Sequence, residues 1–268
     1  MITLNQDSCV KCGHCAEVCP AEILGMTEAG PEENRSTGCI ACGHCMAICP
    51  TGALDLADVP LSEQEPIMEE LTISEEKARQ FLRSRRSVRS YKKDLVPREK
   101  LLKIVDLARL APTGSNGQGT QFIVIENPAI VDKIREKMAV FFEEWLKSDD
   151  PKTRGYRKII EAYRDGKDTL LRGAPQMILA LNEKDNPARH LNGVFALTYA
   201  ELYAPTLGVG TCWAGFFQGY YGAQTTGEMD MLLEIPPDMT ITAALMVGIP
   251  KYSYHRLPER EKLNVLWR

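Results

Sequence analysis

The chain has 268 residues, of which 44% are hydrophobic and 25% are charged, and its formal net charge at pH 7 is −4. This composition is typical of a globular protein with an apolar core. No run of 18 apolar residues is present, which argues against a membrane-spanning helix, and no concentrated basic patch suggests nucleic-acid binding. The first residues lack a basic stretch followed by an apolar one, so we expect a cytoplasmic protein.

Eight of the nine cysteines lie in two copies of one motif, CVKCGHCAEVCP at 9–20 and CIACGHCMAICP at 39–50. Each copy has the spacing C-x2-C-x2-C-x3-C-P. Three thiolates so spaced let a short loop wrap one corner of an iron–sulfur cubane, and the fourth cysteine of this pattern ligates the other cluster. The sequence therefore predicts two [4Fe–4S] clusters. The expected ligand sets are Cys9, Cys12, Cys15 and Cys49 for one, and Cys39, Cys42, Cys45 and Cys19 for the other.

Other interpretations of these cysteines fit less well. A zinc site takes four ligands from paired C-x2-C knuckles and would leave the third cysteine of each run without a role. A disulfide framework does not suit a reducing cytosol, and a c-type haem needs a histidine directly after a C-x-x-C pair. His14 and His44 lie inside the loops, but the thiolates already complete each site, so we expect neither histidine to be a ligand.

The N-terminal part of the chain, residues 1–58, resembles a bacterial ferredoxin with two clusters. Residues 1–60 carry eight acidic and two basic residues, a formal charge of −6 to which thiolate-ligated clusters would add negative charge. The stretch that follows is rich in proline and acidic residues, and we interpret residues 59–75 as a linker.

The linker leads into an expected helix and then into an arginine-rich run. Thr72 and Glu75 fit a capping box, which predicts a helix with Ala78, Phe81 and Leu82 on one face. The run RSRRSVRSY at 83–91 then places four arginines within nine residues. Such a run is often a solvated face, but guanidinium groups also match the geometry of phosphate. Both interpretations stay open at this point.

Helices and strands alternate through the rest of the sequence, which predicts an α/β or α+β body. Pro97 lies at the expected start of a helix whose apolar stripe comprises Leu101, Ile104, Val105 and Ala108. A Gly-rich loop, APTGSNGQGT at 111–120, feeds a strand. Further helices are expected over 128–147, 193–207 and around 226–233, and strands over 176–182, in LGVGTCWAGFF, and over 240–249. The aromatic stripe of 128–147 indicates core or subunit interface rather than a ligand site.

Three motifs follow one another along the chain: RRSVRSY, then APTGSNGQ, then LGVGTCWAGFF followed by VGIPKYSYHRLPER. With them, residues 76–268 resemble the nitroreductase-like FMN flavoproteins, and the whole chain is similar to members of that family fused to a ferredoxin. The resemblance implies an α+β sandwich with a central, mostly antiparallel sheet wrapped by helices. It also implies a homodimer with FMN pockets at the subunit interface.

The resemblance further implies which residues bind FMN. Several guanidinium groups suit a dianionic phosphate, and small residues let backbone amides approach the flavin ring. The phosphate and ribityl end would be held by Arg85, Arg86, Ser87 and Arg89, with Arg256 and Arg260 from the C-terminal tail. The ring would be contacted by Asn116, with Ser115 and Gln118 close by, and at its N5 edge by the backbone of Ala214 and Gly215, after the turn of Gly210, Thr211 and Cys212. No catalytic side chain is implied, because the flavin carries the redox chemistry.

Some positions leave alternatives open. Gly119 and Thr120 stand where the family usually has a proline and an aromatic residue, which leaves the substrate class undecided. Cys212 could be a nucleophile, but we favour a small packed residue because a reactive thiol needs a lowered pKa. Residues 147–169 are strongly charged. They could form an exposed helix pair with Tyr156, Ile159, Ile160 and Tyr163 inside, or a mobile cover over the flavin.

Together these features predict an FMN-dependent oxidoreductase in which two [4Fe–4S] clusters exchange electrons with FMN. The FMN would reduce a nitroaromatic, quinone or related conjugated electrophile. The donor would be a reduced ferredoxin-like carrier, NAD(P)H, or both. One alternative is an electron-transfer module or redox sensor without its own substrate. Another is an FMN enzyme of different chemistry, such as dehalogenation, enone reduction or flavin-derived ring cleavage.

Overall fold

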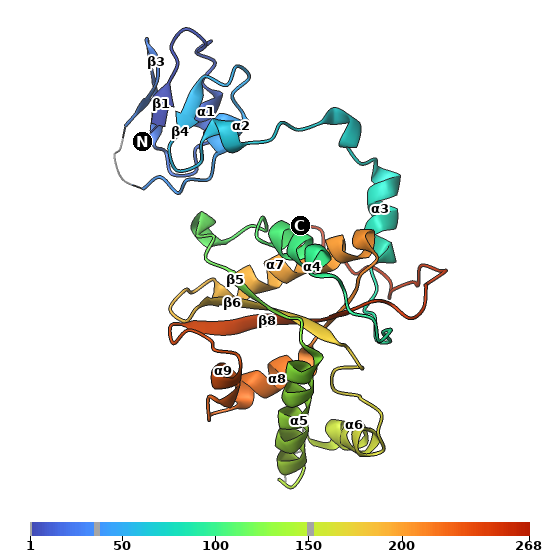
Figure 1. Ribbon diagram of the computed structural model, residues 1–268. Helices are drawn as coiled ribbons and strands as arrows, with labels where there is room; N and C mark the ends of the chain where they lie inside the picture. Colours follow the sequence, from blue (N-terminus) through green and yellow to red (C-terminus); the bar gives the residue numbers. More distant parts are fainter. Residues whose placement is uncertain (1, 35–37, 149–152) are drawn as a thin grey trace. The chain divides into compact units, whose positions relative to one another are not determined.

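The computed structural model describes residues 2–34, 38–148 and 153–268, which fall into two compact units (Figure 1). The first unit comprises Met1–Thr72 with the short segment Gly114–Gly117, and the second comprises Ile73–Thr113 with Gln118–Arg268. No helix in the described ranges is both long enough and apolar enough to cross a lipid bilayer.

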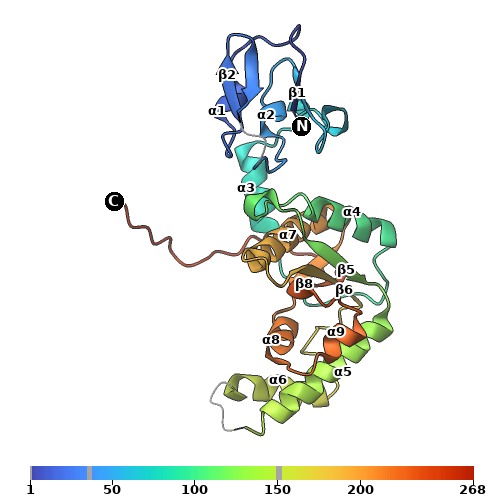
Figure 2. The same ribbon diagram turned by 90° about the vertical axis from the view of Figure 1, so that its left-hand side faces the viewer.

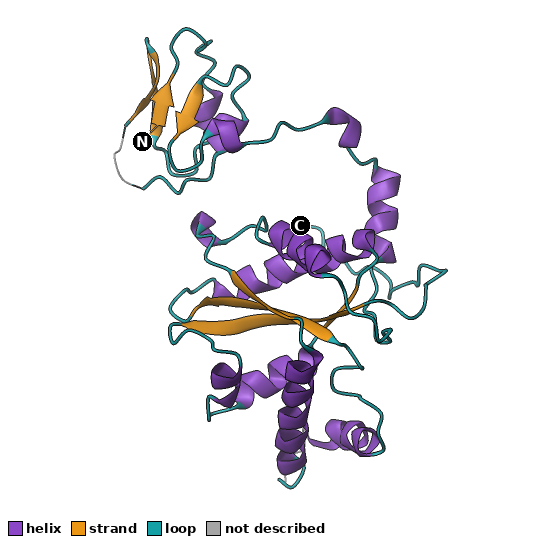
Figure 3. Ribbon diagram, viewed as in Figure 1, coloured by secondary structure: helices purple, strands orange, loops and turns teal. Residues whose placement is uncertain are grey.

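The first unit consists of short elements around the two cysteine motifs (Figure 3). Its strands form two antiparallel pairs, β1 (Ile2–Leu4) with β4 (Leu54–Leu56), and β2 (Leu24–Thr27) with β3 (Gly30–Glu33). Each cysteine motif contains one helical turn, α1 (His14–Glu17) or α2 (His44–Ala47), and two 3-10 turns follow, η1 (Leu61–Glu63) and η2 (Glu69–Leu71). The buried apolar cluster is small and consists of Cys15, Leu24, Met46, Leu54 and Leu56.

The two cysteine motifs repeat each other in backbone conformation as well as in sequence. Gly13 and Gly43 directly precede α1 and α2 with φ values of 82° and 72°, a left-handed conformation that glycine adopts without a steric penalty. Two residues earlier, Lys11 and Ala41 are also left-handed, with φ of 54° and 49°. The repeated sequence therefore folds into the same loop twice.

The second unit is built on a four-stranded sheet in which every neighbouring pair is antiparallel. Its strand order is β5 (Gln121–Ile125), β6 (Gln176–Glu183), β8 (Met239–Gly248) and β7 (Gly210–Trp213). The longest pairing joins β6 and β8, with a register shift between Ala180 and Leu181. This arrangement confirms the expectation of a central, mostly antiparallel sheet in an α+β fold.

Helices cover both faces of this sheet (Figures 1 and 2). One face carries α4 (Arg98–Ala108) and α7 (Arg189–Tyr203), and the other carries α5 (Pro128–Trp145), α8 (Gly215–Ala223) and α9 (Glu228–Leu232), with α6 (Arg154–Arg164) beside α5. Successive residues of β6 point to opposite faces, so Ile178 packs with the α4 and α7 layer while Met177 and Leu179 pack with the α5 layer. Burial on both faces explains why β6 reads as an unbroken apolar run.

Most expected elements are present, and the main differences lie at helix ends. The helix expected over 193–207 begins earlier, at Arg189, and its α-helical part ends at Tyr203, before the 3-10 turn η5 (Ala204–Leu207). Pro205 lies inside that turn, and proline cannot donate the hydrogen bond that an α-helix would need there. In α4, Leu101, Ile104 and Ala108 are buried as the stripe predicts.

The cap of α3 (Glu75–Ser84) corrects one prediction. The sequence suggested Thr72 as the capping residue, but the structure places Ser74 there, where its hydroxyl accepts a hydrogen bond from the Lys77 amide at 3.4 Å. The physical reason is spacing, because a cap satisfies the amide two or three positions into the helix. Thr72 lies outside the first turn and cannot reach those amides.

Candidate cluster and cofactor sites

The first unit contains two cavities lined by cysteine. The first is lined by Cys9, Cys12, Cys15 and Cys49, and the second by Cys19, Cys39, Cys42 and Cys45. Each cavity thus takes three cysteines from one motif and the last from the other motif. The structure brings together the same two groups that the spacing predicts, and four thiols around a cavity fit a cubane cluster.

Backbone amides support the crossing cysteines in the same way in both halves. The amide of Ile23 donates to Sγ of Cys19, and the amide of Ala53 donates to Sγ of Cys49, each at 3.3 Å. Burial tends to raise the pKa of Cys49, but hydrogen bonds from the Thr51 and Ala53 amides outweigh it and lower the pKa. Such N–H···S bonds favour the thiolate form that ligates iron.

The cysteines line cavity walls rather than converging on one point. Among the described residues, no group of three His, Cys, Asp or Glu side chains is arranged to hold a single metal ion. His14 and His44 also line the cavities, one in each. Nδ1 of His44 lies 3.3 Å from the carbonyl oxygen of Cys42, within its own motif.

In the second unit, the arginine motif is an extended segment whose side chains alternate between two surroundings. Arg85 lies beside Glu201 on α7, and Ser87 and Arg89 interact with Cys212 on β7. By contrast, Arg86 and its neighbour Val88 line a large cavity. The amide of Val88 donates to the Thr211 carbonyl at 2.8 Å, which fixes the segment beside β7. The structure therefore distributes the predicted phosphate ligands over two faces.

The large cavity beside Arg86 has a volume of about 550 Å³ and is lined by several cations. Lys92 and Lys251 line it together with Arg86, and no acidic residue is among its described lining residues. The guanidinium of Arg86 lies 5.4 Å from the ring centroid of Tyr254, a cation–π contact that fixes its position. Thr211, expected at the cofactor site, also lines this cavity. Three cations around one opening make this cavity positively charged.

Cys212 is deeply buried and packs within the core. It is 4% exposed and belongs to the apolar cluster of the α5 layer. Burial raises the pKa of its thiol, although Arg89, a hydrogen bond with Ser87, and Arg172 act in the opposite direction. A thiol with a raised pKa is a poor nucleophile, which supports the interpretation of Cys212 as a packed residue.

The residues expected at the flavin N5 edge lie where β7 meets α8. The amide of Ala214 donates to the carbonyl of Ala244 at 2.9 Å, so it is engaged within the sheet. Gly215 opens α8 and is exposed, and the first amides of a helix have no partner inside it. Gly215 is therefore the residue of this pair whose amide can face a ligand.

The Gly-rich loop at 111–120, called the Asn loop below, contains residues in a strained backbone conformation. Ser115, Asn116 and Gln118 have positive φ values of 51°, 54° and 48°, which are uncommon for residues other than glycine and tend to occur at functional sites. Ser115 and Asn116 belong to the first unit, where the Asn116 amide group donates to the carbonyls of Ile40 and Ala41 at 2.9 and 3.1 Å. The proposed contacts of Ser115, Asn116 and Gln118 with the flavin stay predictions.

Thr120, one of the two positions that depart from the family pattern, is fixed by a buried polar chain. Its hydroxyl donates to Oδ1 of Asn182 at 2.9 Å, and the Asn182 amide donates to the Thr242 hydroxyl at 2.8 Å. Asn182 is fully buried on β6. A hydroxyl at this position thus joins the end of the Asn loop to the sheet.

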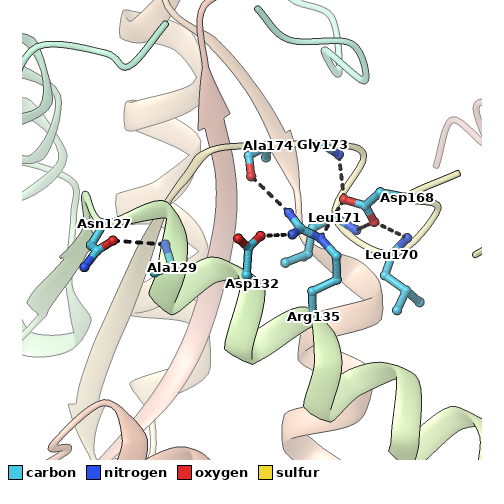
Figure 4. Close-up of polar contacts among 9 residues, drawn as sticks. All are labelled: Asn127, Ala129, Asp132, Arg135, Asp168, Leu170, Leu171, Gly173 and Ala174. Carbon is cyan, nitrogen blue, oxygen red and sulfur yellow. Dashed lines mark hydrogen bonds and ion pairs between the residues drawn. The ribbon is translucent and has the colours of Figure 1, made fainter. Parts of the chain in front are cut away.

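A buried ion pair shapes the loop that enters β6 (Figure 4). The carboxylate of Asp168 accepts backbone hydrogen bonds from Leu170, Leu171 and Gly173 at 2.7–3.0 Å. Nε of Arg135 on α5 lies 2.8 Å from the same carboxylate. Arg172, which lies within this hydrogen-bonded loop, has a left-handed backbone with φ of 58°. The hydrogen bonds to Asp168 therefore hold Arg172 in a strained backbone conformation.

The remaining predicted positions lie apart from these groups. Arg256 and Arg260 are on the exposed tail and are not among the described lining residues of the large cavity. Within 147–169, residues 149–152 lie outside the described residues. In the described part, α6 buries Ile160, and Tyr156, Ile159 and Tyr163 pack against the same core. These are the four residues that the helix-pair interpretation places inside.

Sequence reasoning did not identify several residues at the second-unit site. Lys92 and Lys251 line the large cavity, and Glu201 lies against Arg85. The lysines carry no pattern that separates them from surface lysines. Glu201 did offer a signal, because it is the one acidic residue in the otherwise apolar helical stretch 193–207.

Comparison with known families decides the assignment. Residues 82–249 match the profile of the nitroreductase family, and residues 1–50 match that of the 4Fe-4S dicluster domain. The chain belongs to the nitroreductase family. The resemblance inferred from the three motifs is therefore confirmed, as are the expectations of an enzyme of this family and of two [4Fe–4S] clusters at the N-terminus.

Individual relatives of this nitroreductase-family chain differ in their activities. An iodotyrosine deiodinase of Thermotoga neapolitana is 26% identical over 190 residues, which cover 67% of this chain and 91% of the relative. A 5,6-dimethylbenzimidazole synthase of Rhodospirillum rubrum is 24% identical over 189 residues, covering 67% and 84%. The crystal structure of an FMN-bound nitroreductase from Desulfitobacterium hafniense matches with a TM-score of 0.59 at 20% identity, covering 73% of this chain and 100% of that one. That structural likeness shows the fold, and the relatives do not share one substrate.

Proposed function

We propose that this chain is an FMN-dependent oxidoreductase in which two [4Fe–4S] clusters exchange electrons with FMN. The reduced cofactor would act on a nitroaromatic, a quinone or a related conjugated electrophile. The observation that carries the proposal is the pair of four-cysteine cavities in a chain whose other unit belongs to the nitroreductase family. Cluster sites of this kind transfer electrons and need a partner that converts them into chemistry.

FMN, when bound, accepts electrons singly and delivers them in pairs. Residues of the second unit would bind and orient it. The face of the arginine motif that carries Arg85, Ser87 and Arg89 would hold its phosphate and ribityl end. The exposed start of α8 at Gly215 can offer an amide to the ring. Each reduction takes up protons together with electrons. A quinone needs two of each to become a hydroquinone, and an aryl nitro group needs two of each to become a nitroso group and water.

We also propose the domain organisation and assembly that this function needs. Residues 1–58 would form the ferredoxin domain, residues 59–75 the linker, and residues 76–268 the FMN domain of a homodimer. Support for the dimer comes from α7, on which Leu191, Phe195 and Tyr199 recur every four residues with side chains 39–57% exposed. An exposed apolar stripe of this kind on a folded helix suits burial against a second copy.

An anaerobic titration tests the electron path. The full chain, loaded with FMN and clusters, is reduced with dithionite and methyl viologen while flavin and cluster absorbance are followed. The same titration is run on the double variant Cys12→Ala and Cys42→Ala, and on the control Ile48→Val, whose side chain is exposed in the second motif. We expect viologen-driven flavin reduction to slow strongly in the cysteine variant and not in the control. Equal rates in all three proteins would contradict the proposal.

Reductive dehalogenation is a second candidate, because a deiodinase is among the relatives. In that reaction an aryl iodide takes up two electrons and one proton and yields an arene C–H bond and iodide. An anaerobic panel of nitroarenes, quinones, enones and haloarenes separates the candidates. Release of iodide without turnover of quinones would favour the dehalogenase. Turnover of none of these compounds, with intact cluster and flavin reduction, would favour an electron-transfer module.

A further inference from the structure

A carboxylate that the proposed function has not used lies directly behind the arginine motif. Glu201 is on α7, between the buried residues Ala200 and Ala204 of the α4 and α7 layer. Its side chain is only 13% exposed. An ionised carboxyl group is seldom buried in a helix layer unless it is paired, because removing it from water is unfavourable.

The pairing of Glu201 is incomplete. Its Oε1 lies 3.6 Å from Nη1 of Arg85, which is an ion-pair distance but too long for a hydrogen bond. This oxygen is buried and has no hydrogen-bond donor among the described residues. Burial raises the pKa of Glu201, while Arg85 acts to lower it. A buried polar atom left without a partner needs an explanation, and a functional role is one of the few available.

Any functional role of Glu201 would be exerted through Arg85, the residue with which it forms the ion pair. Its side chain is 27% exposed, and no ion pair or hydrogen bond other than the contact with Glu201 is present for it in the described ranges. A guanidinium group presents several N–H donors in a rigid plane, so one edge can face Glu201 while another faces a ligand. The carboxylate therefore limits the orientations of an arginine that otherwise has no fixed partner.

We propose that Glu201 is a positioning residue that orients Arg85 toward the phosphate of FMN. The inference rests on the proposed function, because it needs FMN as the ligand. Glu201 would act only through Arg85, without touching the phosphate itself, since two negative groups in direct contact repel. Its contribution is to pre-orient the guanidinium, so that less side-chain entropy is lost when the phosphate binds.

A double-mutant cycle tests this role in the full, cluster-loaded chain freed of flavin. The dissociation constants for FMN and for riboflavin, which lacks the phosphate, are measured by flavin fluorescence in the wild type, in Glu201→Gln, in Arg85→Ala and in the double variant. We expect Glu201→Gln to weaken FMN binding by about fivefold and riboflavin binding not at all. In the Arg85→Ala background, Glu201→Gln should have no further effect, because its route to the phosphate is gone.

The control is Glu126→Gln, which makes the same change in an exposed pair with Arg98 in the same unit and should leave both constants unchanged. Circular dichroism and thermal unfolding check the fold of each variant. Should Glu201→Gln fail to fold, Glu201→Asp keeps the charge but shortens the side chain, and it should also weaken FMN and not riboflavin. The proposal is wrong if Glu201→Gln binds FMN like the wild type, affects both flavins equally, or keeps its effect without Arg85. A wild type that binds no FMN would instead overturn the proposed function.

Discussion

The two units bury very different amounts of apolar side chain. Among the described residues, the core of the first unit is a cluster of five, whereas the second unit has clusters of 23 and 13 on the two faces of its sheet. Units of fewer than about 70–80 residues rarely gain enough stability from burial alone and often depend on a metal or another cross-link. In the first unit the loops that would bind the clusters also supply part of the core, through Cys15. We infer that the first unit depends on its clusters for stability, whereas the second unit is stabilised mainly by burial of apolar side chains.

Removal of the clusters should have the largest effect. Treatment with an oxidant and a chelator should abolish hydrogen-exchange protection in the first unit, including the β1–β4 pair, because about four iron–thiolate bonds per cluster are lost and the apolar core is small. Protection of β6 and β8 should persist. Hydrogen exchange is measured by mass spectrometry on the cluster-loaded and the cluster-free protein. Retained protection at Leu54–Leu56 after iron loss would show that the first unit does not depend on its clusters.

Phe142→Ala tests the other half of the comparison. Phe142 on α5 is 2% exposed and stacks on Tyr156 with ring centroids 5.2 Å apart. Its truncation leaves a cavity in the largest core cluster and should lower the free energy of unfolding of the second unit by about 3–5 kcal/mol. Urea unfolding followed by tryptophan fluorescence measures this. The cluster absorbance should be unchanged, and Val140→Ala, at an exposed position of the same helix, serves as the control.

Asp168→Asn should have the next largest effect. Asp168 accepts three backbone amides and pairs with Arg135, and both side chains are largely buried (Figure 4). Loss of the charge leaves Nε of Arg135 beside a neutral group, while Nη1 keeps its ion pair with Asp132. The second unit should be destabilised by about 2 kcal/mol. The control is Asp106→Asn, whose pair with Arg109 is exposed. A loss equal to that of the control, again measured in urea, would mean that the loop is held by packing alone.

Glu201 should make the stability of the second unit depend on pH, with a smaller effect. Burial raises the pKa of Glu201 in the folded state, despite Arg85. As pH rises above the usual glutamate range, the unfolded chain loses this proton before the folded chain does. The free energy of unfolding should therefore fall until pH passes the folded-state pKa. Glu201→Gln should lack this fall. Urea unfolding of both flavin-free proteins between about pH 4 and pH 8 measures the difference, and parallel profiles would contradict it.

Sequence reasoning succeeded where one local pattern decides the structure. The cysteine spacing predicted the two groups of four that line the cavities, because the loop geometry is set within twelve residues. The apolar run at 176–182 predicted a strand, and the structure has β6 there. The antiparallel sheet followed instead from the family resemblance, since strand order depends on contacts between distant segments.

Side-chain partners in the second unit could not be predicted in the same way. The RRSVRSY motif gives no indication that Arg85 and Arg86 face different surroundings, because this depends on how the segment lies beside β7. The pairing of Glu201 with Arg85 joins residues more than 100 positions apart. Even the start of α3 was misplaced, because Thr72 and Ser74 are both acceptable caps and only the path of the backbone selects between them.

The cap of α3 gives the smallest prediction and the finest test of how the second unit begins. The Ser74 hydroxyl accepts the Lys77 amide, whereas Thr72 lies outside the helix. Ser74→Ala should lower the free energy of unfolding by about 1 kcal/mol, the usual effect of losing an N-cap hydroxyl. Thr72→Ala should change it by less than about 0.5 kcal/mol, because it removes no cap. Urea unfolding of the two variants, compared with the wild type, decides the point. A larger loss in Thr72→Ala than in Ser74→Ala would restore the capping box that the sequence first suggested.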